Sequence, residues 1–96
     1  MAKYLRRFSV IADTTPAEIP IPERWRKSPG ARVMYLFNVP GNDVHLVEDA
    51  DDTEGILIES SAISSIPFGP LPAGWMPRRL YAAGATVVTG TIIRTQ

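Results

Sequence analysis

A single histidine limits the acid–base chemistry open to this chain. His45 lies in the alternating run Asp43, His45, Val47, which would place it on a strand near Asp43. A histidine acts as a general base only when a nucleophile lies within hydrogen-bond reach. No nucleophile can be placed beside His45 from the sequence, so we predict a structural, hydrogen-bonded role for this side chain.

The candidate nucleophiles lack the patterns that activate them. The hydroxyl groups of Ser60, Ser61, Ser64 and Ser65 stand outside the Gly-x-Ser-x-Gly elbow that exposes a catalytic serine. The chain has no cysteine, which excludes a thiol nucleophile, a disulfide framework and a cysteine-based zinc site. We therefore expect a protein that is not an enzyme, with no hydrolytic or transferase activity and no cofactor.

The acidic stretch EDADDTEG at residues 48–55 is the only cluster whose side chains suit a metal ion. Carboxylate oxygens are ligands that calcium prefers. The spacing fails the EF-hand pattern, because counting from Asp49 puts Glu54 at the glycine position and Ser60 at the twelfth. An irregular calcium site and a solvated acidic turn both remain possible. We favour the turn and expect no metal requirement.

The charges sum to zero at neutral pH but are segregated along the chain. Residues 1–42 carry seven bases and three acids, residues 43–59 seven acids and no base, and residues 60–96 three arginines and no acid. A neutral chain lacks the basic footprint of non-specific nucleic-acid binding. Opposite charges in separate segments allow head-to-tail association between copies. They could equally neutralise one another within one fold.

The elements that would position these groups are short strands. β-branched runs alternate with Pro and Gly signals every ~8–12 residues, which is typical of a small antiparallel β-sandwich or barrel. We predict one all-β domain over residues 1–96, with no helix longer than about two turns. The predicted strands cover residues 3–12, 32–39, 44–48, 55–60, 62–68, 78–83 and 85–94.

Three further structural predictions follow from the residue types. Residues 32–39 and 44–48 should form a hairpin across the turn Pro40–Asp43. Gly90, inside the last strand, indicates a bulge or a close backbone contact. The loop 69–77 should be rigid, with Trp75 closing one end of the core. The predicted core comprises Val33, Tyr35, Phe37, Ile56, Ile58, Leu80 and Val87.

Residues 14–30 contain four prolines and predict an extended arm with at most one helical turn, from Pro22 to Trp25. A single tryptophan among bases is too little for a nucleic-acid stacking platform, so we expect Trp25 to anchor the arm against its own domain or a neighbouring subunit. The arm is our candidate partner-binding segment, and the acidic stretch of a neighbouring copy is one possible acceptor. The predicted contact residues are Ile19, Ile21, Arg24, Trp25, Arg26 and Lys27 on the arm, and Asp49, Asp51 and Asp52 in the acidic stretch.

The carboxy-terminal half contains IESSAISSIPFGPLPAG (58–74) followed by PRRLYAAGATVVTGTII (77–93). This succession of a Pro/Gly turn, a Leu-Tyr-Ala strand and a β-branched closing strand resembles small accessory proteins of tailed-bacteriophage virions. The resemblance implies a non-enzymatic structural protein that decorates or cements the capsid, or serves at the head or tail. Its implied partners are copies of itself and other virion proteins.

The same resemblance implies a virion location after synthesis in the host cytoplasm. The apolar run at residues 8–12 is too short for a signal peptide, and no run approaches the ~20 apolar residues of a membrane span. We therefore expect no membrane partner and no specific nucleic acid. The alternative function is a stand-alone β-sandwich module that binds carbohydrate or peptide. That function would need Trp25, Trp75 and Tyr81 on one exposed patch.

Overall fold

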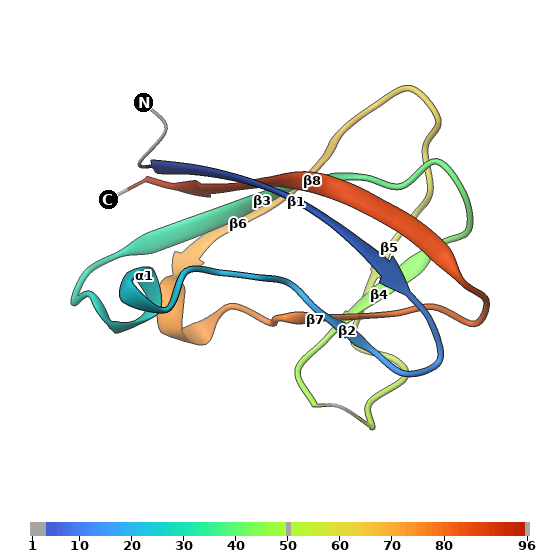
Figure 1. Ribbon diagram of the computed structural model, residues 1–96, viewed down its shortest axis with the longest axis horizontal. Helices are drawn as coiled ribbons and strands as arrows, with labels where there is room; N and C mark the ends of the chain where they lie inside the picture. The colour runs from blue at the N-terminus through green and yellow to red at the C-terminus, as the bar shows by residue number, and fades with distance from the viewer. Residues whose placement is uncertain (1–3, 50, 96) are drawn as a thin grey trace.

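Two antiparallel sheets of four strands each build the molecule (Figure 1). The computed structural model describes residues 4–49 and 51–95, so the predicted beginning of the first strand at Lys3 lies outside the described residues. The predicted all-β fold class is confirmed. The first sheet has the order β1 (Leu5–Ala12), β8 (Thr86–Arg94), β3 (Arg32–Asn38), β6 (Ile66–Pro72). The second has the order β2 (Ala17–Glu18), β7 (Arg79–Tyr81), β4 (Val44–Val47), β5 (Ile56–Ile58).

The helix α1 (Glu23–Lys27) and the 3-10 turn η2 (Ala73–Trp75) are both short. The predicted helical turn near Pro22 is confirmed, with Pro22 in extended conformation just before the helix rather than inside it. Neither piece, nor any other helix among the described residues, is long and apolar enough to cross a membrane.

The core is built around β3, which lies between β8 and β6. Its residues Val33, Tyr35 and Phe37 are fully buried, as the alternating pattern predicts. The Phe37 ring meets Phe8 edge-on at 6.1 Å between centroids and lies 5.1 Å from the Tyr35 ring. From the second sheet, the predicted core residues Ile58 and Leu80 are buried against this face.

The prediction that Ile56 and Val87 belong to the core is wrong. Val87 is 54% exposed because it pairs with Ile11 on the outer face of the first sheet, while the neighbouring Val88 points inward. The last strand therefore has the opposite parity to the predicted one. Ile56 is 42% exposed because it begins the edge strand β5, beside the acidic stretch, where it is only partly covered.

The predicted hairpin between residues 32–39 and 44–48 is also wrong. β3 pairs with β6 and β8 in the first sheet, whereas β4 pairs with β5 and β7 in the second. The turn Pro40–Asp43 is thus a crossover between sheets. Because distant segments occupy both edges of β3, no edge remains for β4. Val39 and Val44, on either side of the crossover, are both fully buried.

The Pro/Gly-rich segment after residue 65 is more strand than loop. β6 begins at Ile66, later than predicted, and continues through Pro67, Pro70 and Pro72. Prolines are tolerated there because β6 is an edge strand that pairs only with β3. Trp75 is 75% exposed, so the prediction that it closes the core is wrong. The buried residues of this segment are its small and flexible neighbours, Ala73 and Met76.

Gly90 confirms the predicted close backbone contact. A Cβ atom at this position would overlap the carbonyl oxygen of Leu36 and lie 2.9 Å from two ring carbons of Phe8. We expect Gly90→Ala to lower the free energy of unfolding by about 1–3 kcal/mol, because a backbone atom must move to admit the methyl group. Urea denaturation would measure this change.

Gly84→Ala is the matched control for Gly90→Ala. The nearest heavy atom to a Cβ at Gly84 is the Asn42 side-chain nitrogen at 3.9 Å, an ordinary contact. This variant should stay within about 0.5 kcal/mol of the wild type. Equal stability of the two variants would contradict the proposed overlap at Gly90.

Candidate functional site

The proline-rich segment 14–30 packs on its own domain. β2 pairs with β7, and the Ile19 amide donates a hydrogen bond to the Arg78 carbonyl oxygen at 2.7 Å. Ile19, Ile21 and Trp25 are 1%, 8% and 2% exposed and belong to the core. The prediction that these three side chains meet a partner is therefore corrected: the domain's own sheets cover them. Trp25 anchors the segment to its own domain, one of the two roles expected for it.

The bases of α1 take three different environments. Lys27 is exposed and forms a salt bridge with Glu23 one turn earlier, at 3.2 Å. Arg24 is exposed on the same helical turn. Arg26 is partly buried and lines a pocket. The burial of Trp25 sets these directions, because neighbouring residues on a helix project to different sides.

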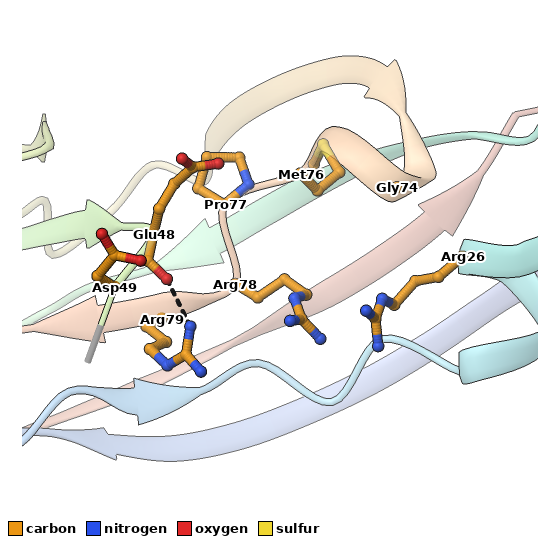
Figure 2. Close-up of a pocket in the computed structure, with 8 residues that line it drawn as sticks. All are labelled: Arg26, Glu48, Asp49, Gly74, Met76, Pro77, Arg78 and Arg79. Carbon is orange, nitrogen blue, oxygen red and sulfur yellow. Dashed lines mark hydrogen bonds between the residues drawn. The ribbon is translucent and has the colours of Figure 1, made fainter.

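This pocket has a volume of about 260 Å³ and draws its walls from three segments. Figure 2 shows Arg26 from α1, Glu48 and Asp49 from the acidic stretch, and Arg78 and Arg79 at the beginning of β7. Two predicted partner-binding residues, Arg26 and Asp49, therefore line one cavity within a single chain. The remaining lining residues are Gly74, Met76 and Pro77.

Two of the pocket arginines, Arg78 and Arg79, were not predicted as site residues. The available signal was their adjacency: they are the only consecutive bases in residues 60–96, and they follow a proline. Arg79 already has partners within the chain. Its guanidinium donates a hydrogen bond to the Glu48 carbonyl oxygen and lies 3.8 Å from the Glu18 carboxylate.

Arg26 and Arg78 are arranged differently from Arg79. Their side chains point toward one another in Figure 2. Within residues 4–49 and 51–95, neither guanidinium forms a salt bridge or a hydrogen bond. Glu48 and Asp49 lie on the side of the group away from Arg26; the backbone oxygen of Glu48 meets Arg79, and its carboxylate points away from Arg79. The pocket thus has a cationic end and an anionic end.

A buried phenol supports the cationic end. The Tyr35 hydroxyl donates a hydrogen bond to the Pro77 carbonyl oxygen at 2.8 Å, which ties the segment carrying Arg78 to the core strand β3. Burial raises the pKa of Tyr35 well above its usual value, although the charges of Arg78 and Arg26 act in the opposite direction. Tyr35 therefore remains a neutral donor at physiological pH.

The predicted structural role of His45 is confirmed. Its Nδ1 lies 2.7 Å from the Glu54 carbonyl oxygen, an acceptor, so this nitrogen carries the proton. The nearby Asp43 carboxylate accepts the Ser60 backbone N–H at 2.7 Å. That hydrogen bond is the main cause of the lowered pKa of Asp43, and the charge of His45 contributes less. Both side chains fasten the segments around β4 and β5.

Two of the serines that were candidate nucleophiles make ordinary local hydrogen bonds. The Ser61 hydroxyl oxygen accepts the backbone N–H groups of Ile63 and Ser64 at 3.4 and 3.1 Å. The Ser65 hydroxyl donates to the Asn38 side-chain oxygen at 3.0 Å. These contacts shape the segment before β6.

The acidic stretch has the geometry of a turn in its described residues. The Asp52 amide donates to the Asp49 carbonyl oxygen at 3.2 Å, and the Glu54 amide to the Asp52 carboxylate at 3.3 Å. Ala50, inside the stretch, lies outside the described residues. No group of three potential metal ligands occurs in the part of the chain that the structure describes. Of the predicted acidic contact residues, Asp49 lines the pocket, and Asp51 and Asp52 belong to the turn.

Segments far apart in the sequence thus build one charged site. A pair of unpaired guanidinium groups can bind an oxyanion through charge-assisted, bidentate hydrogen bonds. No protein-family model, curated protein or solved structure matches this chain.

Proposed function

We propose that this chain is a non-enzymatic structural protein of a bacteriophage particle, which decorates or cements the capsid or serves at the head or tail. It acts through contacts with copies of itself and with other virion proteins. The resemblance of residues 58–93 to virion accessory proteins supports this function. The structural observation that carries it is the difference between the two edges of the first sheet.

The edge formed by β6 is protected against further pairing. Pro67, Pro70 and Pro72 have no backbone N–H to donate, and the pairing register with β3 shifts between Val33 and Tyr35. Prolines and irregular pairing are two of the devices by which soluble proteins prevent one sheet edge from joining another. This edge therefore offers a poor template for a second chain.

The edge formed by β1 has neither proline nor a register shift along its length. The strand has eight residues without proline, and its register with β8 is unbroken from Leu5–Ile93 to Ala12–Thr86. On its other side β1 forms no backbone hydrogen bonds with another strand of the described chain. A long, regular, unpaired edge is a template for a strand from another molecule.

The occupant that best fits this edge is β1 of a second copy, in antiparallel orientation. Arg6 and Arg7 stand near the beginning of the strand, and Asp13 follows its last residue. Antiparallel pairing about a two-fold axis would bring the basic beginning of each copy to the acidic end of the other. Leu5 and Ile11, which are 47% and 60% exposed, would add apolar contact beside the new pairing.

Light scattering after size-exclusion chromatography tests this assembly. We expect the wild-type mass to be a dimer or larger, increasing with protein concentration. Ile11→Lys should shift the protein to monomer, because the new charge would approach Arg6 and Arg7 of the antiparallel neighbour. Ile11→Glu should retain association, since a carboxylate there meets the same arginines favourably.

Ile63→Lys is the control for adding a lysine, because Ile63 is 95% exposed and lies outside the sheets. It should associate as the wild type does. A wild type that remains monomeric at every concentration would contradict this assembly and favour the stand-alone binding module.

The aromatic patch of that alternative function is not formed in the structure. Trp25 is buried in the core, so it cannot share an exposed surface with Trp75 and Tyr81. Trp75 is exposed and Tyr81 is partly buried, 6.0 Å from the His45 ring. A carbohydrate- or peptide-binding module would have to use a different surface.

A further inference from the structure

Arg26 and Arg78 form a pair of like charges with no acidic partner among the described residues. Both are partly buried, and their side chains point toward one another across the pocket (Figure 2). Other bases nearby behave differently: Lys27 contacts Glu23, and Arg79 contacts Glu18. Two cations that face each other without an anion repel, and the repulsion is stronger at a partly desolvated site than in bulk water.

The backbone holds this pair in place from both sides. Arg26 follows the buried Trp25 in α1, so the core fixes the position of its backbone. Arg78 follows Pro77, whose carbonyl oxygen accepts the Tyr35 hydrogen bond, and its own carbonyl oxygen accepts the Ile19 amide at 2.7 Å. A cationic site carried on fixed backbone loses less conformational entropy when a ligand binds.

We propose that Arg26 and Arg78 bind a single phosphate group. Each guanidinium can donate two parallel hydrogen bonds to oxyanion oxygens. Their two positive charges match the charge of about −1.5 to −2 that a phosphate monoester carries near pH 7. This site does not depend on the proposed structural function.

The acidic end of the pocket limits the size of the ligand. Glu48 and Asp49 line the same pocket, and their negative charges would repel a second anionic group placed near them. A continuous phosphate backbone therefore fits poorly. An isolated phosphate group, free or on a small molecule, meets only the cationic end.

Isothermal titration of the full chain with inorganic phosphate at low ionic strength tests the site. We expect one phosphate per chain, and a melting temperature that rises with phosphate concentration because the ligand binds the folded state. Arg26→Gln and Arg78→Gln should each weaken binding by about tenfold or more, the loss of one charge-assisted contact. Arg24→Gln, on the same helical turn but exposed, should bind like the wild type.

Two further variants keep the test independent of folding. Arg26→Lys and Arg78→Lys retain the charge and the fold but lose the planar fork, so their binding should be intermediate. Without phosphate, the Gln variants should melt no lower than the wild type, because they relieve the repulsion. Unchanged phosphate affinity in the Gln or Lys variants would overturn the site. An equal loss of phosphate affinity in Arg24→Gln would show general charge attraction in place of a specific site. Acetate binding as tightly as phosphate would overturn the match to a dianion.

Discussion

Replacing Phe37 by alanine is expected to lower the free energy of unfolding by about 3–5 kcal/mol. The Phe37 side chain on β3 is 0% exposed to solvent. The Phe8 ring meets it edge-on, and the Tyr35 ring lies beside it. Removing the ring loses its burial and leaves a cavity in the core between the two sheets, which closes only if the close-packed side chains around it shift. Urea denaturation followed by circular dichroism would measure the change.

The control for this variant is Val87→Ala, on the strand paired with β3. Val87 is 54% exposed on the outer face, so its truncation should cost less than about 1 kcal/mol, mostly through strand propensity. A loss below about 1 kcal/mol for Phe37→Ala would show that the inward face of β3 is assigned incorrectly.

Deleting residues 16–27 and joining the ends with a short Gly/Ser linker is expected to abolish folding. An independent arm would leave the domain folded when removed. The structure predicts the opposite, because the deletion removes Ile19, Ile21 and Trp25 from the core and β2 from the second sheet. Trp25→Ala alone should cost about 3–5 kcal/mol. Circular dichroism and the dispersion of amide signals in NMR would report the loss of structure.

Lys27→Ala is the control on the same helix. Lys27 is exposed, and its contact with Glu23 is a surface pair of the kind that contributes under about 1 kcal/mol. A deletion variant that remains folded and melts cooperatively would refute the place of this segment in the core. It would also restore the arm as a free partner-binding element.

The segregation of acidic and basic side chains along the chain is still compatible with charge pairing between copies. Within the described residues, the acidic side chains of residues 43–59 form no salt bridge, and the two salt bridges join Lys27 to Glu23 and Arg79 to Glu18. Direct neutralisation of this stretch within the fold is therefore small. Arg24 and Lys27 on α1, and Asp51 and Asp52 in the acidic stretch, remain at least partly accessible. Their contact with partners stays a prediction.

The amino-acid sequence alone determined the fold class and the inward face of the most regular strand. Val33, Tyr35 and Phe37 stand at alternate positions of a β-strand run, and a strand places alternate residues on one face regardless of its neighbours. Gly90 was recognisable for a related reason, since glycine in a strand interior indicates a close approach. Both features are local, so local pattern was enough to predict them.

Tertiary structure decided what each strand pairs with. The turn Pro40–Asp43 is compatible with both a hairpin and a crossover, and the occupation of both edges of β3 by β6 and β8 selects the crossover. The parity of β8 followed from its position between β1 and β3, which placed Val88 inside and Val87 outside. These choices depend on segments distant in sequence, which a local pattern does not contain.

The same distinction applies to the site. The sequence shows bases in residues 24–27 and acids in residues 48–54, but it does not show which of these side chains lie close together in the fold. Packing of Trp25 into the core turned Arg26 toward Arg78, and the pairing of β4 with β7 brought Glu48 beside Arg79. Burial of Trp25 and exposure of Trp75 were likewise decided by the space between the sheets, because two tryptophans in Pro-rich segments have the same local preference and only one of them lies over the core.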